Sequence, residues 1–157
     1  MKTKTINLYQ FSELSPEGKE KALHSLCDIN VDHDWWDYIY EDAERIGLKI
    51  TSFETDRYAK GKLTLSPEEV CNQITKEHGY MCETVQTAKK YLEDRANLGE
   101  EPSDGKLDDL KDEFLKSLLE DYRIILSKEY EYLTSDEQII ETILANDYYF
   151  TEDGKIG

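Results

Sequence analysis

The side chains of this chain that most readily do chemistry are three histidines, three cysteines and 35 acidic residues. None of the histidines (His24, His33 and His78) has a cysteine or a second histidine at the spacing of a zinc site. The sequence also contains no GxSxG, phosphate-loop, dinucleotide-binding or HExxH motif. We therefore expect no metal, no cofactor and no catalytic residue, and we favour a protein that is not an enzyme. An enzyme whose carboxylates meet only in space stays open as an alternative.

Acidic residues dominate the charge, because 35 Asp and Glu stand against 19 Lys and Arg, which gives a net charge of −16. A surface this negative repels nucleic acids and anionic membranes, so we expect neither as a direct partner. It suits a protein partner with a basic surface. The densest run, taken as candidate partner-binding residues, is Glu100, Glu101, Asp104, Asp108, Asp109, Asp112 and Glu113. One interpretation is solubility through charge repulsion, and the other is a surface that competes with nucleic acid for a basic groove.

The cysteines Cys27, Cys71 and Cys82 are odd in number and lack CxxC spacing. Two of them fall on apolar helical stripes, so we expect reduced and mostly buried thiols, as in a cytosolic protein. No stretch is apolar for long enough to span a membrane, and no signal peptide opens the chain. These features predict an intracellular protein without a membrane partner.

Residues 32–50 contain the signals of a whole helix and of the strand that follows it. Asp32 or Asp34 is a suitable N-cap, because a short carboxylate accepts hydrogen bonds from the first turn. Gly47 is a suitable C-terminal stop, after which Leu48 opens an alternating strand. The apolar stripe of this helix is Trp35, Ile39, Ala43 and Ile46.

The adjacent tryptophans, Trp35 and Trp36, point roughly 100° apart on a helix. Either both rings pack in the core, or one is exposed as an interface anchor. The sequence leaves both interpretations open. The predicted core residues are Trp35, Ile39, Leu118 and Ile143.

The other segments alternate helices with short strands. Helices are predicted from residue 16 to residues 28–30, from 67 to about 78, over 81–98, over 107–133 and from 134 or 135 onwards. The predicted N-caps are Ser15, Ser66 and, for the last helix, Thr134 or Ser135. Strands are predicted over residues 3–11, 48–58, 63–65 and 148–151, with turns at 60–62 and, of type I′, at 152–155. Residues 99–105, GEEPSDG, read as an exposed loop.

This order of elements predicts an α+β fold with a small, mainly antiparallel sheet and several helices packed on one face. We expect the sheet to include residues near Ile6, Ile50 and Tyr149, and the two terminal strands to be neighbours. The length of 157 residues suits a single domain, residues 1–157, with the loop at 99–105 inside it. The sequence does not determine an oligomeric state.

Two segments resemble known proteins. The opening, INLYQFSELSPEGKEKAL and INVDHDWWDYIYEDAERIGLKI, and the ending ANDYYFTEDGKIG are similar to small uncharacterised acidic proteins of bacteriophages and prophages. The resemblance covers the N-terminal third and the C-terminal end only, and it brings no catalytic residue with it. It implies a phage protein in the cytoplasm of a bacterial host, where small acidic proteins such as some anti-CRISPR proteins disarm host defences.

Charge and resemblance together predict an acidic inhibitor or interaction protein that binds a host defence component. The expected partner is a nucleic-acid-binding defence protein with a basic surface, which this chain would engage as a nucleic-acid mimic. The alternatives are a small enzyme that modifies a host factor or a nucleotide signal, and an antitoxin-like accessory protein.

Overall fold

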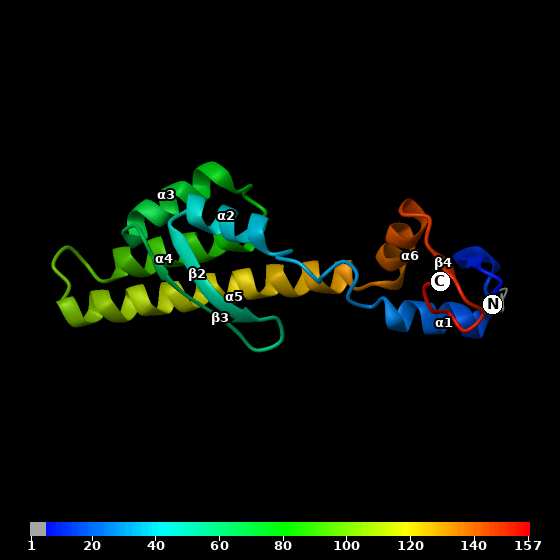
Figure 1. Ribbon diagram of the computed structural model, residues 1–157. Coiled ribbons are helices and arrows are strands. Elements are labelled where there is room, and N and C mark those ends of the chain that lie inside the picture. The colour runs from blue at the N-terminus through cyan, green and yellow to red at the C-terminus, as the bar shows by residue number, and fades with distance from the viewer. Residues whose placement is uncertain (1–5) are drawn as a thin grey trace. The chain divides into compact units, whose positions relative to one another are not determined.

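The computed structural model describes residues 6–157 (Figure 1). Helices account for 58% of the described residues and strands for 12%, so the predicted α+β class is confirmed. The chain divides into two compact units. Unit 1 contains the described residues up to Trp35 together with Glu129–Gly157, and unit 2 contains Trp36–Lys128. The predicted single domain, residues 1–157, stays a prediction.

Unit 1 holds a two-stranded sheet made from the two ends of the chain. β1 (Tyr9–Gln10) pairs antiparallel with β4 (Tyr149–Phe150), so the prediction that the terminal strands are neighbours is confirmed. The first strand is shorter than predicted. Ile6, a residue expected in the sheet, lies outside it and is 61% exposed. Residues 3–5 of the predicted strand lie outside the described residues.

The first strand ends early because the chain tightens after it. Phe11–Glu13 form a short 3-10 helix, η1. The backbone N–H of Gln10 donates to Glu13 Oε1 at 2.8 Å, which replaces a ladder hydrogen bond with a local one. The ring of Phe11 then packs edge-on against that of Phe150, with 6.2 Å between the ring centroids.

Two helices cover this sheet, α1 (Pro16–Ser25) and α6 (Asp136–Ala145). The side chains of Ser15 and Ser135 each accept a hydrogen bond from a backbone N–H three residues later. The predicted N-cap at Ser15 is therefore confirmed, and of the two candidates before α6, Ser135 rather than Thr134 is the cap. The core of unit 1 comprises the buried residues Phe11, Leu14, Ala22, Ile139, Ile143 and Phe150.

The C-terminal turn packs on α1. Ile156 bridges Phe150 in antiparallel fashion, so the predicted returning arm is present. The predicted type I′ turn is wrong, because that type needs two residues with positive φ and, among residues 152–155, only Gly154 has one (79°). A Cβ on Gly154 would lie 2.5 Å from the backbone oxygen of Gly18, so glycine lets the two backbones touch.

Unit 2 opens with α2 (Asp37–Arg45), which passes directly into β2 (Leu48–Glu54). Gly47 joins them with a φ of 93°, the left-handed conformation expected of a residue that ends a helix. Ile39 and Ala43 form the buried side of α2, as the periodicity predicts.

The helix begins later than predicted. Trp36 occupies the N-cap position without a capping side chain, so the predicted caps at Asp32 and Asp34 are wrong. The physical reason is the packing of Trp35, which belongs to unit 1, is 8% exposed and has its ring centroid 5.8 Å from that of Tyr130. Trp35 therefore lies before the helix rather than on its stripe.

Trp36 belongs to an aromatic cluster of unit 2. Its ring centroid lies 5.6 Å from that of Phe53 on β2 and 6.5 Å from that of Tyr40 on α2. The rings of Tyr40 and Phe53 also meet edge-on, at 6.0 Å. Both tryptophans thus contact other aromatic rings, which agrees with the interpretation that they anchor packing.

The hairpin in unit 2 is a sheet of its own. β2 pairs antiparallel with β3 (Tyr58–Leu63), and the turn between them lies at residues 55–57. The predicted turn at 60–62 is therefore wrong, and the predicted single sheet is two separate two-stranded sheets. Gly61 is a strand residue opposite Ile50, next to a bulge, and a Cβ on it would lie 2.3 Å from the backbone oxygen of Lys49.

Three further helices complete unit 2: α3 (Pro67–Glu77), α4 (Glu83–Asn97) and α5 (Asp104–Leu133). Ser66 caps α3, as predicted, because its Oγ accepts a hydrogen bond from a backbone N–H three residues later. α4 and α5 lie side by side (Figure 1), and α5 contributes its residues up to Lys128 to this unit. The buried stripe of α5 is as broad as predicted and comprises Leu110, Phe114, Leu118, Leu119, Tyr122 and Leu126.

The predicted core is confirmed. The exposed fractions are 8% for Trp35, 2% for Ile39, 0% for Leu118 and 1% for Ile143. Trp35 and Ile143 are buried in unit 1, whereas Ile39 and Leu118 are buried in unit 2.

We expect Trp35→Ala to lower the free energy of unfolding of unit 1 by about 3–5 kcal/mol, because it removes a large buried ring and leaves a cavity beside Tyr130. Chemical denaturation followed by circular dichroism measures this loss. The control is Tyr132→Ala, which truncates a side chain that is 55% exposed and should cost about 0.5 kcal/mol or less. An unchanged midpoint for Trp35→Ala would contradict the packing described here.

Two glycine substitutions in unit 2 should differ in their effect on stability. Gly61→Ala should destabilise the unit by about 1–3 kcal/mol, because its Cβ meets the backbone of the neighbouring strand. Gly105→Ala, in the first turn of α5 with no atom near its Cβ, should be neutral or stabilise by up to about 1 kcal/mol. Urea unfolding of both variants tests this, and equal effects would show that Gly61 is not sterically required.

Candidate functional site

The seven predicted partner-binding residues form one exposed segment, which we call the acidic edge: Glu100, Glu101, Asp104, Asp108, Asp109, Asp112 and Glu113. All seven are exposed. The first two lie on the loop between α4 and α5, and the other five lie on the first turns of α5. The structure therefore brings these predicted residues together on neighbouring elements of unit 2.

The loop is shorter than the predicted 99–105, because α5 begins at Asp104. The Oγ of Ser103 accepts a hydrogen bond from the Lys106 N–H at 3.3 Å, which starts the helix earlier than the apolar pattern indicates. Asp104 and Gly105 are thus helical. Asp104 lies in the first turn, where the helix dipole favours an acid.

Most carboxylates of the acidic edge have no internal counter-ion. Glu113 accepts a hydrogen bond from Lys90 Nζ at 3.3 Å, and the other six make no ion pair with any residue in the range 6–157. Asp104, Asp108 and Asp112 follow one another at intervals of four, so they line one side of the helix. Like charges at this spacing repel, and only Asp104 is placed to gain from the dipole.

A second polar feature of unit 2, which we call the Asp42 network, links Asp42, His78, Thr84 and Tyr122. Oδ2 of Asp42 lies 2.9 Å from His78 Nε2 and accepts a hydrogen bond from the Tyr122 hydroxyl at 2.7 Å. The other ring nitrogen of His78, Nδ1, lies 2.5 Å from Thr84 Oγ1. These residues come from α2, the end of α3, α4 and α5, so the network ties four elements together.

The chemistry of the groups assigns the hydrogens. A carboxylate only accepts, so the hydrogen between Asp42 and His78 belongs to Nε2. Burial, together with the bond to Asp42, raises the pKa of Tyr122 well above its ordinary value of 10, so its hydroxyl remains a donor. Asp42 therefore receives two hydrogen bonds on the same oxygen.

The order Thr84, His78, Asp42 is that of a nucleophile, a base and an acid in hydrolases. Thr84, however, is only 2% exposed, and the side chain of His78 is 9% exposed. A nucleophile must reach its substrate, so this arrangement serves to position Asp42 rather than to attack a bond. Asp42 itself is 35% exposed.

Asp42 and His78 open onto a recess of about 370 Å³ in unit 2. The start of α4, from Cys82 to Thr84, forms one part of its wall, and residues of α5 from Asp121 to Lys128 form another. Asp121 is held there by Thr87, whose hydroxyl donates to Asp121 Oδ2 at 2.5 Å. Burial raises the pKa of Asp121, and the nearby acids Glu83 and Glu120 raise it further.

The cysteines differ in exposure. Cys71 is buried against α4, and burial raises the pKa of its thiol to about 12, so it is an unreactive packing residue. Cys27 and Cys82 are exposed, so the expectation of mostly buried thiols is wrong for these two. Among the described residues, no group of three or more His, Cys, Asp and Glu side chains is arranged to hold a metal ion. No helix within residues 6–157 is long and apolar enough to cross a membrane.

The sequence gives no sign of the Asp42 network. His78 follows a helix end, Asp42 is one acid among 35, and Tyr122 falls on an apolar stripe. The separation of 80 positions between Asp42 and Tyr122 hides their contact from any local pattern. The single available hint is a tyrosine in the middle of a leucine-rich stripe, since a buried hydroxyl needs a partner.

No protein-family model matches the chain, and comparison with curated proteins and with solved structures finds no significant match. What the protein does must therefore be inferred from its own residues.

We expect Tyr122→Phe to lower the free energy of unfolding by about 1–3 kcal/mol, because it removes a buried donor from Asp42. Tyr91→Phe is the matched control, since it removes a hydroxyl that donates to the exposed Glu68 and should cost less. A cost for Tyr122→Phe no greater than that of the control would show that the Asp42 network does not stabilise unit 2.

The free energy of unfolding should depend on alkaline pH more strongly in the wild type than in Tyr122→Phe. Because the folded pKa of Tyr122 is raised, the folded state keeps a proton that the unfolded chain loses above pH 10. The stability from this tyrosine is thus fully present below pH 10 and is lost as the pH rises further. Denaturation between pH 8 and 11 should show a steeper loss for the wild type than for the variant.

Proposed function

We propose that this protein is an acidic inhibitor or interaction protein that uses the acidic edge to bind a basic groove on a nucleic-acid-binding defence protein of a bacterial host. One observation carries the proposal: six neighbouring carboxylates are exposed and have no ion pair within residues 6–157. A basic partner would supply the counter-ions that the chain itself does not.

The spacing of charge in the acidic edge supports competition with nucleic acid. Five carboxylates lie along Asp104–Glu113 of α5, a length of about 14 Å at 1.5 Å per residue. That is about one carboxylate per 3 Å, close to the roughly 3.4 Å per phosphate along one strand of DNA. Lys106 and Lys111 reduce the net charge of this stretch, so the match concerns acid spacing rather than total charge.

Simple solubility is the competing explanation of the same acids. It requires only net charge, and net charge can be spread over any exposed position. The distribution here is uneven, since the acidic edge places seven acids within 14 consecutive positions, from Glu100 to Glu113. The local density is what favours a binding surface.

The phage setting rests on the resemblance of the two chain ends to phage and prophage proteins. A protein made during infection and carrying such a surface suits the role of an anti-defence factor, similar to acidic anti-CRISPR proteins. The partner class proposed is a host protein whose basic groove ordinarily holds nucleic acid.

The test is charge reversal at Glu101, Asp108, Asp109 and Asp112, each to Lys. The partner is first identified by capture from a host lysate, and association rates are then measured at low and high salt. Long-range attraction acts mainly on the encounter rate, so the variant should associate at least tenfold more slowly at low salt and show a flatter salt dependence.

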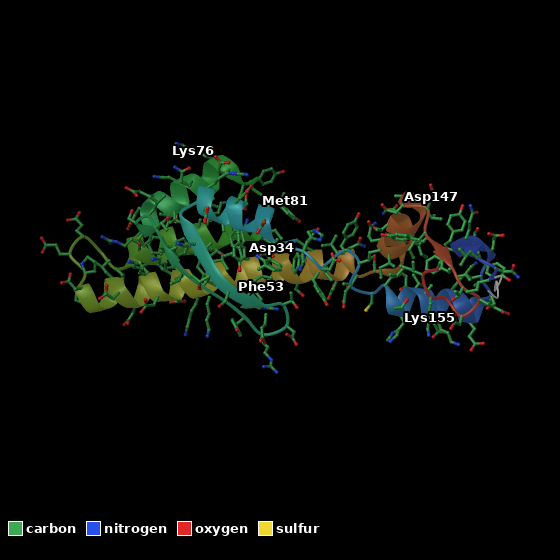
Figure 2. All side chains as sticks on the ribbon, viewed as in Figure 1. Asp34, Phe53, Lys76, Met81, Asp147 and Lys155 are labelled. Carbon is green, nitrogen blue, oxygen red and sulfur yellow. The ribbon has the colours of Figure 1, made fainter. Side chains whose placement is uncertain are left out.

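The matched control reverses four exposed acids of unit 1 to Lys: Glu20, Asp34, Glu131 and Glu141. Asp34 is labelled in Figure 2. Both variants change the net charge equally, so the control should retain most of the wild-type rate. Equal slowing of both variants would show that net charge alone, and not the acidic edge, sets the association rate. Unchanged rates in the acidic-edge variant would also contradict the proposal.

A further inference from the structure

Two carboxylates of the recess are held in a similar way. Asp42 accepts both of its hydrogen bonds on Oδ2, from His78 and Tyr122, and Asp121 accepts a bond from Thr87 on its own Oδ2. No described residue donates a hydrogen bond to Oδ1 of either acid. Two orientated carboxylates with unoccupied oxygens are therefore fixed in the wall of one recess before any ligand arrives.

The charge of the recess favours a cation. Asp42, Glu83 and Asp121 line it against a single lysine, Lys128. Asp121 is half-buried, and its raised pKa shows that burial disfavours its charged form. A bound cation would offset that cost, whereas an anion would increase it.

The rest of the wall is apolar. Ile124 and Ile125 project from α5 beside the carboxylates, so the recess combines an aliphatic surface with two acceptors. Its volume of about 370 Å³ lies within the range of small-molecule sites. A guanidinium group suits it better than an ammonium group, because guanidinium is planar, more weakly hydrated and able to donate to two carboxylates at once.

We propose that the recess between Asp42 and Asp121 binds an alkyl guanidinium cation, with the guanidinium on the two carboxylates and the alkyl chain along Ile124 and Ile125. The source is either an arginine side chain of a bound protein or a free small guanidine, because both present the same chemistry. This site is additional to the acidic edge. The recess lies at the start of α4 and the acidic edge follows its end, about 22 Å away along a helix of 15 residues.

The surroundings of the recess suit a ligand that enters from solvent. The loop before α4 carries Tyr80 and Met81, which are 76% and 79% exposed and precede Cys82, a residue of the recess wall. Met81 is labelled in Figure 2. An exposed methionine adapts to a partner's surface, and an exposed tyrosine supplies rigid contact area. A protein that placed an arginine in the recess would meet these two side chains next.

The first experiment is a titration of the full-length protein with butylguanidinium, followed by NMR and by calorimetry. Butylurea is the matched ligand control, since it has the same shape without the charge. The proposal expects butylguanidinium to bind at least tenfold more tightly than butylurea and to shift the signals of His78 and Ile125. Equal affinities for the two compounds, or no binding of either, would overturn it.

Variants locate the site. Asp121→Asn should weaken binding at least tenfold, and Ile125→Lys, at a position 39% exposed, should do so by placing a tethered ammonium group in the recess without altering either carboxylate. Asp112→Asn, on the acidic edge, is the control and should bind as the wild type does. Circular dichroism confirms that each variant is folded. Wild-type affinity in both recess variants would overturn the assignment.

Two ligands of equal charge distinguish the sources. Tighter binding of N-acetylarginine methylamide than of butylguanidinium supports an arginine side chain of a protein, and the reverse supports a free small guanidine. The four-lysine variant of the acidic edge should still bind butylguanidinium. Failure of the recess proposal is therefore separable from failure of the proposed function.

Discussion

The arrangement of unit 2 depends on the hydrogen bonds that converge on one carboxylate oxygen, Oδ2 of Asp42. A carboxylate that is two-thirds buried must be satisfied by donors, and here they come from Tyr122 on α5 and from His78 after α3. His78 in turn contacts Thr84 on α4. These polar contacts therefore fix the relative positions of four elements within an otherwise apolar interior. A shift of any one element would leave a buried polar group without its hydrogen bond.

The same carboxylate connects the stability of unit 2 with the binding role proposed for the recess. Two hydrogen bonds hold Asp42 through Oδ2, and Oδ1 accepts none from the described residues. Asp121 is held similarly by Thr87. Preorganised acceptors of this kind lose little entropy when a cation binds. The acidic edge differs, since its carboxylates are exposed surface groups whose electrostatic effect depends on ionic strength. One chain thus presents two sorts of negative site, at opposite ends of α4.

Local chemistry explains the elements that the sequence predicts well. Serine caps at residues 15, 66 and 135, the glycine stop at Gly47 and the broad apolar stripe of α5 depend on neighbours within a few positions. Core positions such as Ile39 and Leu118 follow from helical periodicity alone. The acidic edge could also be located by reading the sequence, because charge density needs no tertiary contact.

Other features were decided only by the tertiary structure, because each depends on residues far apart in the chain. Gly61 resembles a turn residue in sequence, yet it is needed where the backbone of Lys49 approaches it across the hairpin. Trp35 resembles a helix residue, yet its ring packs against Tyr130 in another unit from Trp36. The terminal strands pair with each other and not with the central hairpin. The Asp42 network joins positions up to 80 residues apart. The sequence by itself therefore determined which acids are present, and only the fold decided which of them is partly buried and held by hydrogen bonds.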